Sequence, residues 1–185
     1  LSTWSLMFRH PSQLGYEDHG FDLPPLTVQI ETVHLEGAVG TQSGQLFATK
    51  LNGIGGRLSA RRSSLQARVE RTIELVKGNE EQWIIWCGLN EEGRRLAQGI
   101  PGACFVEGQD SLASKEQAAR DFVAGHTRIL ISKPSIMGFG LNFQHCHNVV
   151  HLGLGDSYES YYQSIRRCWR YGQAVPVKVF IVISE

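Results

Sequence analysis

Three arginines stand close together near the end of the sequence, at positions 166, 167 and 170. If this segment is a helix at about 100° per residue, Arg166, Arg167 and Arg170 share one face with Gln163. Like charges at these spacings repel one another by roughly 0.2–0.5 kcal/mol a pair. The spacing is sensible if an anion lies opposite, because a guanidinium matches the oxygens of a phosphate group. Most charge runs are solvated faces, but no acidic residue follows Glu159 in this segment to balance the arginines. The pattern predicts an anion-binding face.

We expect this helix to run from Ser157 to Tyr171, with Asp156 capping its start and Glu159 reaching back as in a capping box. Three aromatic side chains form an edge beside the arginines, and we expect them to pack rather than to stack on a base: Tyr158, Tyr162 and Trp169. The anion-binding interpretation requires arginines without internal carboxylate partners that face the ligand-binding edge of the fold.

A second stretch with possible chemistry extends from Ser132 to Phe143. Gly138 and Gly140 follow an apolar run, but Phe143 stands where the dinucleotide fingerprint G-x-G-x-x-G requires its third glycine. No phosphate loop of the form G-x-x-x-x-G-K-[ST] occurs anywhere in the sequence. If this chain acts on a nucleotide, another part must supply the phosphate cradle.

Other catalytic patterns are weak. No Ser/His/Asp or Cys/His arrangement declares itself, which leaves a stand-alone α/β enzyme poorly supported. His145, Cys146 and His147 have no second ligand pair at suitable spacing, so we predict no metal site.

The elements that must position these residues alternate between short apolar runs and helical patterns. The expected strands are Leu26–Leu35, Trp83–Cys87, Ala103–Val106, Thr127–Ser132, Asn148–Leu152 and Val177–Ile183. The other expected helices are Ser43–Lys50, Ser64 to Gly78 with Ser63 or Ser64 as cap, Glu91–Gln98, and Ser114–Ala124 with Ser114 as cap. Continuous apolar strands separated by helices imply a parallel sheet with helices on both faces.

Such sheets bind ligands outside the carboxyl ends of their strands. Three segments fall there: Cys87–Asn90, the loop Lys133–Asn142, and Gly153–Tyr158. A group of basic residues lies instead at or just before the helix that starts at Ser64: Arg57, Arg61, Arg62, Arg68 and Arg71. A solvated face is the expected role of that group, and contact with a phosphate backbone is the alternative.

Composition sets further bounds. The sequence has 185 residues, a net charge of zero, 42% hydrophobic and 19% charged residues, which suits one globular domain with an appendage. Without net charge, phosphate binding has to come from local arginines. No apolar run has the length of a membrane span and no signal peptide is recognisable, so we expect no membrane partner. Four widely spaced cysteines indicate buried, reduced thiols of an intracellular protein. The start at Leu1 and the end directly after a strand suggest a lobe of a longer protein.

The run from Trp83 to Glu185 resembles the second, C-terminal RecA-like lobe of superfamily-two helicases and translocases. Three segments carry the resemblance in the family's order: Ile84–Asn90 is similar to motif four, Ser132–Phe143 to motif five and Gln163–Gln173 to motif six. The ending Gln163-x-x-x-Arg167-x-x-Arg170-x-Gly-Gln173 is most similar to the Swi/Snf-type branch and its phage and prophage relatives. The resemblance implies a RecA-like lobe at residues 61–185, preceded by an arm and insertion at 1–60.

The resemblance also implies roles for single residues. Arg167 and Arg170 match the arginine fingers, which reach the triphosphate held by the first lobe, and Gln163 matches the glutamine that orients that contact. Gly140 and Asn142 match the positions that approach the ribose and couple the lobes, although the family has Asp where this chain has Asn142.

Three residues fall where the family touches the nucleic-acid backbone: Ser132, Lys133 and Asn90. Two more departures from the Swi/Snf-type pattern are Trp169 in place of His and Arg166 in place of Asp.

The function implied is that of one half of an ATP-dependent DNA helicase or translocase, intracellular and encoded by a bacterium or phage. ATP and Mg²⁺ would be bound mainly by the N-terminal RecA-like lobe, with nucleic acid, DNA by this resemblance, as the second partner. The isolated chain is then expected to be inactive. The alternative is a non-catalytic nucleic-acid-binding module that keeps the lobe's fold.

Overall fold

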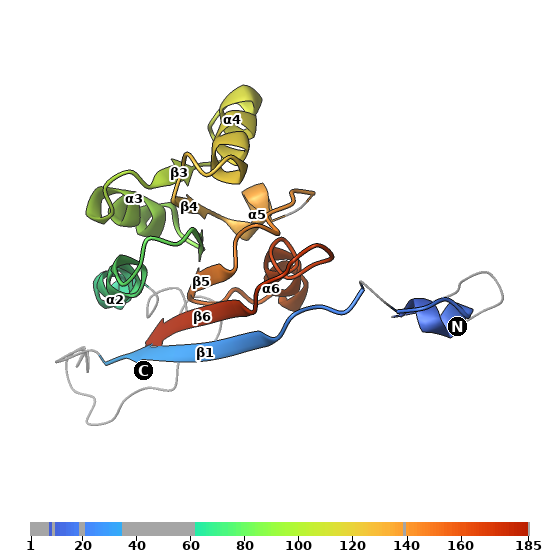
Figure 1. The fold of residues 1–185 in the computed structure, drawn as a ribbon. Coiled ribbons are helices and arrows are strands. Elements are labelled where there is room, and N and C mark those ends of the chain that lie inside the picture. The colour runs from blue at the N-terminus through green and yellow to red at the C-terminus, as the bar shows by residue number, and fades with distance from the viewer. Residues whose placement is uncertain (1–7, 9, 19–20, 35–61, 139, 185) are drawn as a thin grey trace.

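The computed structural model describes residues 8, 10–18, 21–34, 62–138 and 140–184 (Figure 1). Its described strands form one parallel sheet in the order β1-β6-β5-β2-β4-β3. They are β1 (Leu26–Val33), β2 (Trp83–Cys87), β3 (Cys104–Val106), β4 (Ile129–Ser132), β5 (Asn148–Leu152) and β6 (Val177–Ser184). The helices are η1 (Pro11–Leu14), α2 (Leu65–Lys77), α3 (Asn90–Gly99), α4 (Leu112–Val123), α5 (Pro134–Met137) and α6 (Tyr158–Ile165).

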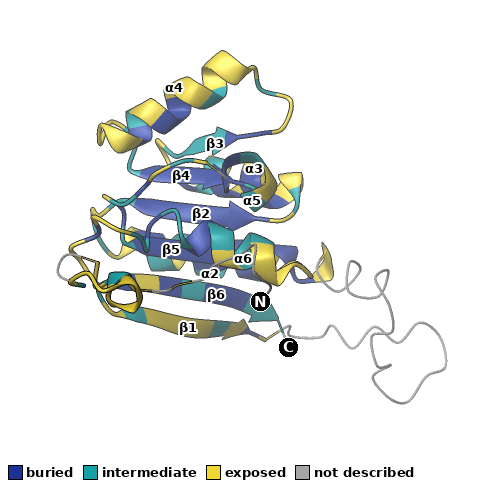
Figure 2. Cartoon of the chain, turned by 90° about the vertical axis from the view of Figure 1, so that its right-hand side faces the viewer, coloured by how far each residue is buried: buried dark blue, intermediate teal, exposed yellow. Residues whose placement is uncertain are grey.

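The centre of the sheet is covered on both faces and mostly apolar, with Ser132, Asn148 and His151 as its buried polar residues. Every residue of β2, β4 and β5 is buried, as the dark strands of Figure 2 show. Two hydrophobic clusters lie on opposite faces: α2 and α3 pack on one, and α4, α5 and α6 on the other (Figure 1). The prediction of a parallel sheet with helices on both faces is therefore confirmed, and the architecture is that of a RecA-like α/β lobe.

The edge strand β1 comes from the region expected to precede the lobe. It pairs with β6 along its whole length, from Leu26 opposite Val177 to Val33 opposite Ser184. Its outer part is mostly exposed (Figure 2). The boundary between residues 60 and 61 stays a prediction, but residues 26–33 belong to the same sheet as the lobe. The expected helix Ser43–Lys50 lies outside the described residues.

Several local expectations are corrected. Helix α4 is capped by Ser111, whose hydroxyl accepts a hydrogen bond from the Ser114 amide at 3.1 Å, so Ser114 lies inside the helix instead of capping it. The loop after β4 contains the one-turn helix α5, which begins at Pro134, a residue suited to the first helical position. The Ser64 side chain does not cap α2; its oxygen accepts from Arg68 Nε at 3.0 Å.

Arg68 is the clearest exception to the expected solvated basic face. It is 1% exposed, and its guanidinium donates to Glu92 Oε1 at 2.9 Å and to the Leu152 carbonyl at 3.2 Å. The other Glu92 oxygen accepts from the amides of Gly88 and Leu89. This buried ion pair therefore ties α2 to the start of α3 and to the end of β5.

The remaining basic residues of that group differ from Arg68. Arg62 is exposed, and Arg71 pairs with Glu31 and Glu74. Arg57 and Arg61 are not among the described residues.

All four cysteines are free thiols, three of them buried and Cys104 half-buried. In the part of the chain that the structure covers, no group of three His, Cys, Asp or Glu side chains could hold a metal ion. No helix there is long and apolar enough to cross a membrane.

Candidate functional site

Helix α6 is shorter than the sequence pattern suggested. It ends at Ile165 with Arg166 as its C-cap, so the arginines lie on the turns that follow rather than on a helix reaching Tyr171. The backbone tightens there, because Cys168 donates to the Ile165 carbonyl three residues back. The predicted cap is also wrong: Ser157, not Asp156, accepts the hydrogen bond from the Ser160 amide, at 3.1 Å.

Arg167 is held by neutral oxygen atoms. Its Nε and one terminal nitrogen donate to the backbone carbonyl and the side-chain oxygen of Gln163, each at 3.0 Å, and the other terminal nitrogen donates to the Leu141 carbonyl at 3.0 Å. Arg170 donates to the same Leu141 carbonyl at 3.4 Å. The structure therefore brings Arg167 and Arg170 together at the Leu141 carbonyl, and Gln163 accepts two further hydrogen bonds from Arg167.

The ion pairs formed by described residues do not include Arg166, Arg167 or Arg170. Partial burial, and then the nearby charges of Arg170 and Arg166, lower the pKa of Arg167. Both burial and the neighbouring positive charges disfavour the charged form of this guanidinium.

Arg166 lies apart from the other two. Its guanidinium carbon is 6.0 Å from the centre of the Tyr162 ring and 5.4 Å from that of Trp169. Tyr158 stacks on Tyr162 with ring centres 6.1 Å apart, and it is 75% exposed. The aromatic edge is therefore packed largely on itself and on Arg166.

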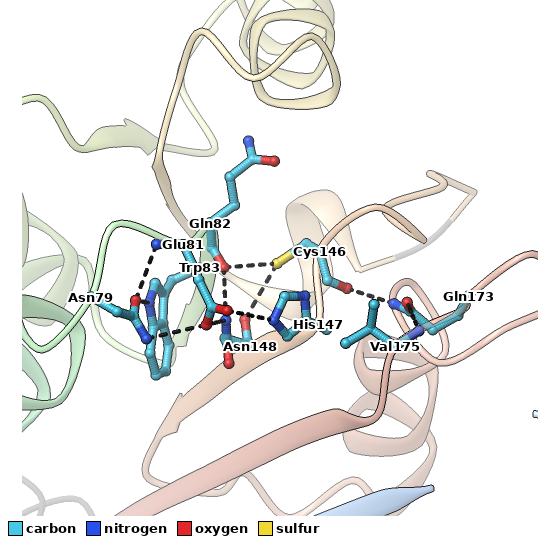
Figure 3. Close-up of polar contacts among 9 residues, drawn as sticks. All are labelled: Asn79, Glu81, Gln82, Trp83, Cys146, His147, Asn148, Gln173 and Val175. Carbon is cyan, nitrogen blue, oxygen red and sulfur yellow. Dashed lines mark hydrogen bonds and ion pairs between the residues drawn. The ribbon is translucent and has the colours of Figure 1, made fainter. Parts of the chain in front are cut away.

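The arginine turns lie toward the amino ends of the strands. Trp169 Nε1 donates to the carbonyl of Pro24, just before β1, at 2.8 Å. Gln173 donates to the carbonyl of Cys146, just before β5, at 3.0 Å (Figure 3). One of the two requirements of the anion-binding interpretation therefore fails, since the arginines do not lie at the carboxyl ends of the strands, where such sheets bind ligands. Helix α6 starts at the carboxyl end of β5 and runs back, which leaves its last residues at the amino ends.

Gly140 and Asn142 flank the shared acceptor, Leu141. Gly140 has a φ of 75°, a left-handed conformation that glycine adopts readily. The exposed Asn142 side chain accepts from the Gln144 amide at 3.2 Å, and the Phe143 amide donates to the Arg167 carbonyl at 2.9 Å. The residues predicted to approach the ribose, Gly140 and Asn142, therefore lie beside the predicted arginine fingers at Leu141.

The residues assigned to nucleic acid lie at the carboxyl ends of the strands, opposite the arginines. Lys133 and Asn90 line one pocket of about 290 Å³ at the carboxyl ends of the strands, together with Glu107, Gly108, Gln109, Ser135 and Ile136. Ser132 is a correction: it is 0% exposed, and its hydroxyl donates to the Val106 carbonyl at 3.0 Å. As the last residue of a buried strand, Ser132 presents no side chain to a ligand in this structure. Gln109 and Ser135 were not singled out from the sequence, although Ser135 lies within the Ser132–Phe143 segment.

The fold is a RecA-like α/β lobe that matches the C-terminal lobes of helicases. Residues 67–172 match the family described as helicase conserved C-terminal domain, and the chain belongs to that family. A curated relative is the human ATP-dependent DNA helicase Q4, 29% identical over 121 residues. The match covers 56% of this chain and 10% of that protein, so the chain spans about a tenth of the relative's length.

Solved structures agree on the fold. A DEAD box protein from Methanococcus jannaschii is 25% identical with a TM-score of 0.57, over 65% of this chain and 33% of that one. The yeast DEAD-box splicing factor Prp28 has a TM-score of 0.62 at 14% identity, over 88% of this chain and 30% of that one. The C-terminal part of the Fun30 ATPase domain has a TM-score of 0.58 at 16% identity, over 64% and 41%. The last two likenesses concern the fold alone.

Proposed function

We propose that this chain is the C-terminal lobe of an ATP-dependent DNA helicase or translocase. In this proposal Arg167 and Arg170 are arginine fingers for ATP and Mg²⁺ held by an N-terminal RecA-like lobe. The observation that carries it is the pair of guanidiniums that share the Leu141 carbonyl and have no carboxylate partner among the described residues. Their hydrogen-bonded partners are neutral, which leaves both positive charges available to an incoming triphosphate.

The chemistry asks for charge and position more than for bond-making groups. Phosphoryl transfer to water spreads negative charge over the transferred phosphate, and an arginine finger is worth about 10³–10⁵ in rate. Gln163 serves as the positioning residue, because its backbone and side-chain oxygens fix the direction of Arg167. Fingers supplied by a second lobe make hydrolysis depend on closure of the two lobes, and closure moves whatever the lobes hold.

Nucleic acid would be contacted by Lys133 and Asn90, at the carboxyl ends of the strands. The pocket that Lys133 and Asn90 share supports this role. Nucleic acid bound there would also lie away from the nucleotide, which is proposed to contact the arginines at the amino ends of the strands. DNA is proposed as the substrate because the curated relative is named a DNA helicase. Gly140 and Asn142 are proposed to approach the nucleotide and to couple the lobes.

The finer classification also remains a proposal. The Gln163-x-x-x-Arg167-x-x-Arg170-x-Gly-Gln173 ending supports the Swi/Snf-type branch, and with it an intracellular protein of bacterial or phage origin.

The test supplies an N-terminal lobe, either in the longer protein or in trans, and measures DNA-stimulated ATP hydrolysis. Arg167→Ala and Arg170→Ala should each lower the rate by about 10³ or more. Arg166→Ala is the matched control and should cost less than about tenfold, because its guanidinium lies over two rings and does not bind Leu141. Turnover at the wild-type rate in both finger variants would exclude the assignment.

The same preparation addresses the non-catalytic alternative. If both finger variants hydrolyse ATP normally while the isolated chain binds DNA with a steep dependence on salt, the chain is a nucleic-acid-binding module.

A further inference from the structure

Strand β1 leaves one edge of the sheet open. It is the last strand in the sheet order, and its eight residues pair with β6 on one side along their whole length. Among the described residues no strand pairs with its other side, so the backbone amides and carbonyls on that side are free to bind a partner. Figure 2 shows this strand at the lower edge of the sheet, mostly exposed.

The side chains of β1 add apolar surface to this edge. Val28 and Ile30 are 48% and 65% exposed, and they share one face of the strand because alternate residues point the same way. Their neighbours in β6 are Val179 and Ile181, which are buried in the hydrophobic cluster on the α4, α5 and α6 face. On this face β6 is therefore covered, whereas Val28 and Ile30 are not.

Strand β1 also lacks the features that keep most edge strands from pairing. Natural sheets protect their edges with short strands, proline, lysine or bulges. The eight residues of β1 keep a continuous register with β6, without a bulge, and they include neither proline nor lysine. The charged residue of the strand, Glu31, points to the other face, where Arg71 of α2 pairs with it at 2.9 Å. The edge is therefore suited to accept a further strand.

We propose that two copies of this chain associate through β1, with the strands antiparallel about a two-fold axis at Gln29. Such an axis requires a surface that is complementary to itself. With Gln29 facing Gln29 of the other copy, Val28 lies beside Ile30 of the other copy, and symmetry forms this apolar pair twice. Thr27 lies beside Glu31 of the other copy, so like charges do not face each other.

The charge of the whole chain also favours a second copy as the partner. The sequence has no net charge, so two copies do not repel each other at long range. Pairing through β1 joins the two sheets into one continuous sheet, with the helices of both copies on its two faces. The interface does not depend on the proposed helicase function and uses none of the residues assigned to it.

The first experiment measures the mass of the whole chain in solution by analytical ultracentrifugation over a wide range of concentrations. We expect a dimer, and for Ile30→Lys a dissociation constant at least about tenfold higher, because symmetry places the lysine in the interface twice. Leu112→Lys is the matched control. Leu112 is 73% exposed on α4, at the other end of the sheet (Figure 1), and its replacement should change the dissociation constant less than about twofold. Thermal unfolding checks that both variants are folded.

Single cysteine variants test the register. Residues directly opposite each other in antiparallel strands have Cβ atoms about 4.5–5.5 Å apart, close to the separation in a disulfide. Gln29→Cys should therefore form a disulfide-linked dimer when oxidised glutathione is added. Thr27→Cys should not, because the position opposite Thr27 is Glu31 of the other copy. The unmodified chain, with three buried cysteines and one half-buried, gives the background.

Three results would overturn the proposal. A chain that is monomeric at every concentration excludes the dimer and leaves the edge to a strand from another protein or from a further part of a longer one. Equal dissociation constants of the unmodified chain and Ile30→Lys show that any dimer forms through another surface. Equal rates of crosslinking in Gln29→Cys and Thr27→Cys exclude the two-fold axis at Gln29.

Discussion

At the scale of single residues, His151 shows how far burial can change a side chain. It lies inside β5, 3% exposed, with its ring 5.0 Å from that of Tyr161 and its Nε2 3.4 Å from the Ser164 hydroxyl. Desolvation lowers its pKa from 6.5 to about 3. The folded protein therefore holds this imidazole neutral at a pH where an unfolded chain would protonate it.

We expect His151 to make the protein sensitive to acid. Its folded pKa lies below the unfolded value, so the unfolded chain binds the extra proton first, and stability falls as the pH drops below about 6.5. At pH 4.5 the loss from this residue is about 2–3 kcal/mol, at about 1.4 kcal/mol per pH unit. Urea unfolding at pH 7 and pH 4.5 measures it, with His151→Gln as the comparison. An equal loss in both proteins would show that His151 does not carry the effect.

At the scale of secondary-structure elements, the buried pair Arg68–Glu92 fixes how α2 and α3 meet the sheet. Both side chains are almost fully buried, at 2% and 0% exposure. A buried ion pair adds little net stability compared with apolar residues of similar size. Removing one partner is costly, however, because it leaves the other charge unpaired in the core.

Arg68→Ala should therefore cost about 3–5 kcal/mol of unfolding free energy. Arg71→Ala, three residues along the same helix, removes a partly exposed partner of Glu31 and Glu74 and should cost less than about 1 kcal/mol. Denaturant midpoints of the two variants decide the matter. Similar small losses would mean that Arg68 is not the structural residue described above.

Elements were predictable from sequence where local pattern alone determines them. The limits of β2 and β5 agree with the strands predicted at Trp83–Cys87 and Asn148–Leu152, because strands buried on both faces are rich in apolar residues. The end of α6 was not predictable in this way. Its turns are held by distant partners, Pro24 for Trp169 and Cys146 for Gln173, which no periodicity within the segment reveals. Burial of Arg68 was hidden for the same reason, since Glu92 and Leu152 lie far along the chain.

At the scale of the whole molecule, β1 connects the region before the lobe to the sheet. Strand β1 has eight residues and covers the outer side of β6. A chain starting at residue 62 would lack β1, so β6 would become the exposed edge strand.

We expect a chain of residues 62–185 to unfold at a lower temperature than one of residues 21–185, and to associate through the exposed β6 edge. Thermal unfolding and size-exclusion chromatography measure the two effects. Matching melting temperatures and a monomeric short chain would support a lobe that begins at residue 61.

The segment from Lys133 to His147 connects the carboxyl end of β4 to the amino end of β5. It contains the Leu141 carbonyl, to which both Arg167 and Arg170 donate. A ligand bound at Lys133 is therefore linked through the main chain to Leu141, and through its carbonyl to Arg167 and Arg170. If the proposed roles are right, nucleic acid bound at Lys133 changes the position of Arg167 and Arg170 through this segment. Proton exchange at the Phe143 amide, bonded to the Arg167 carbonyl, would slow on DNA binding if this connection transmits strain, and would stay constant if the two edges act alone.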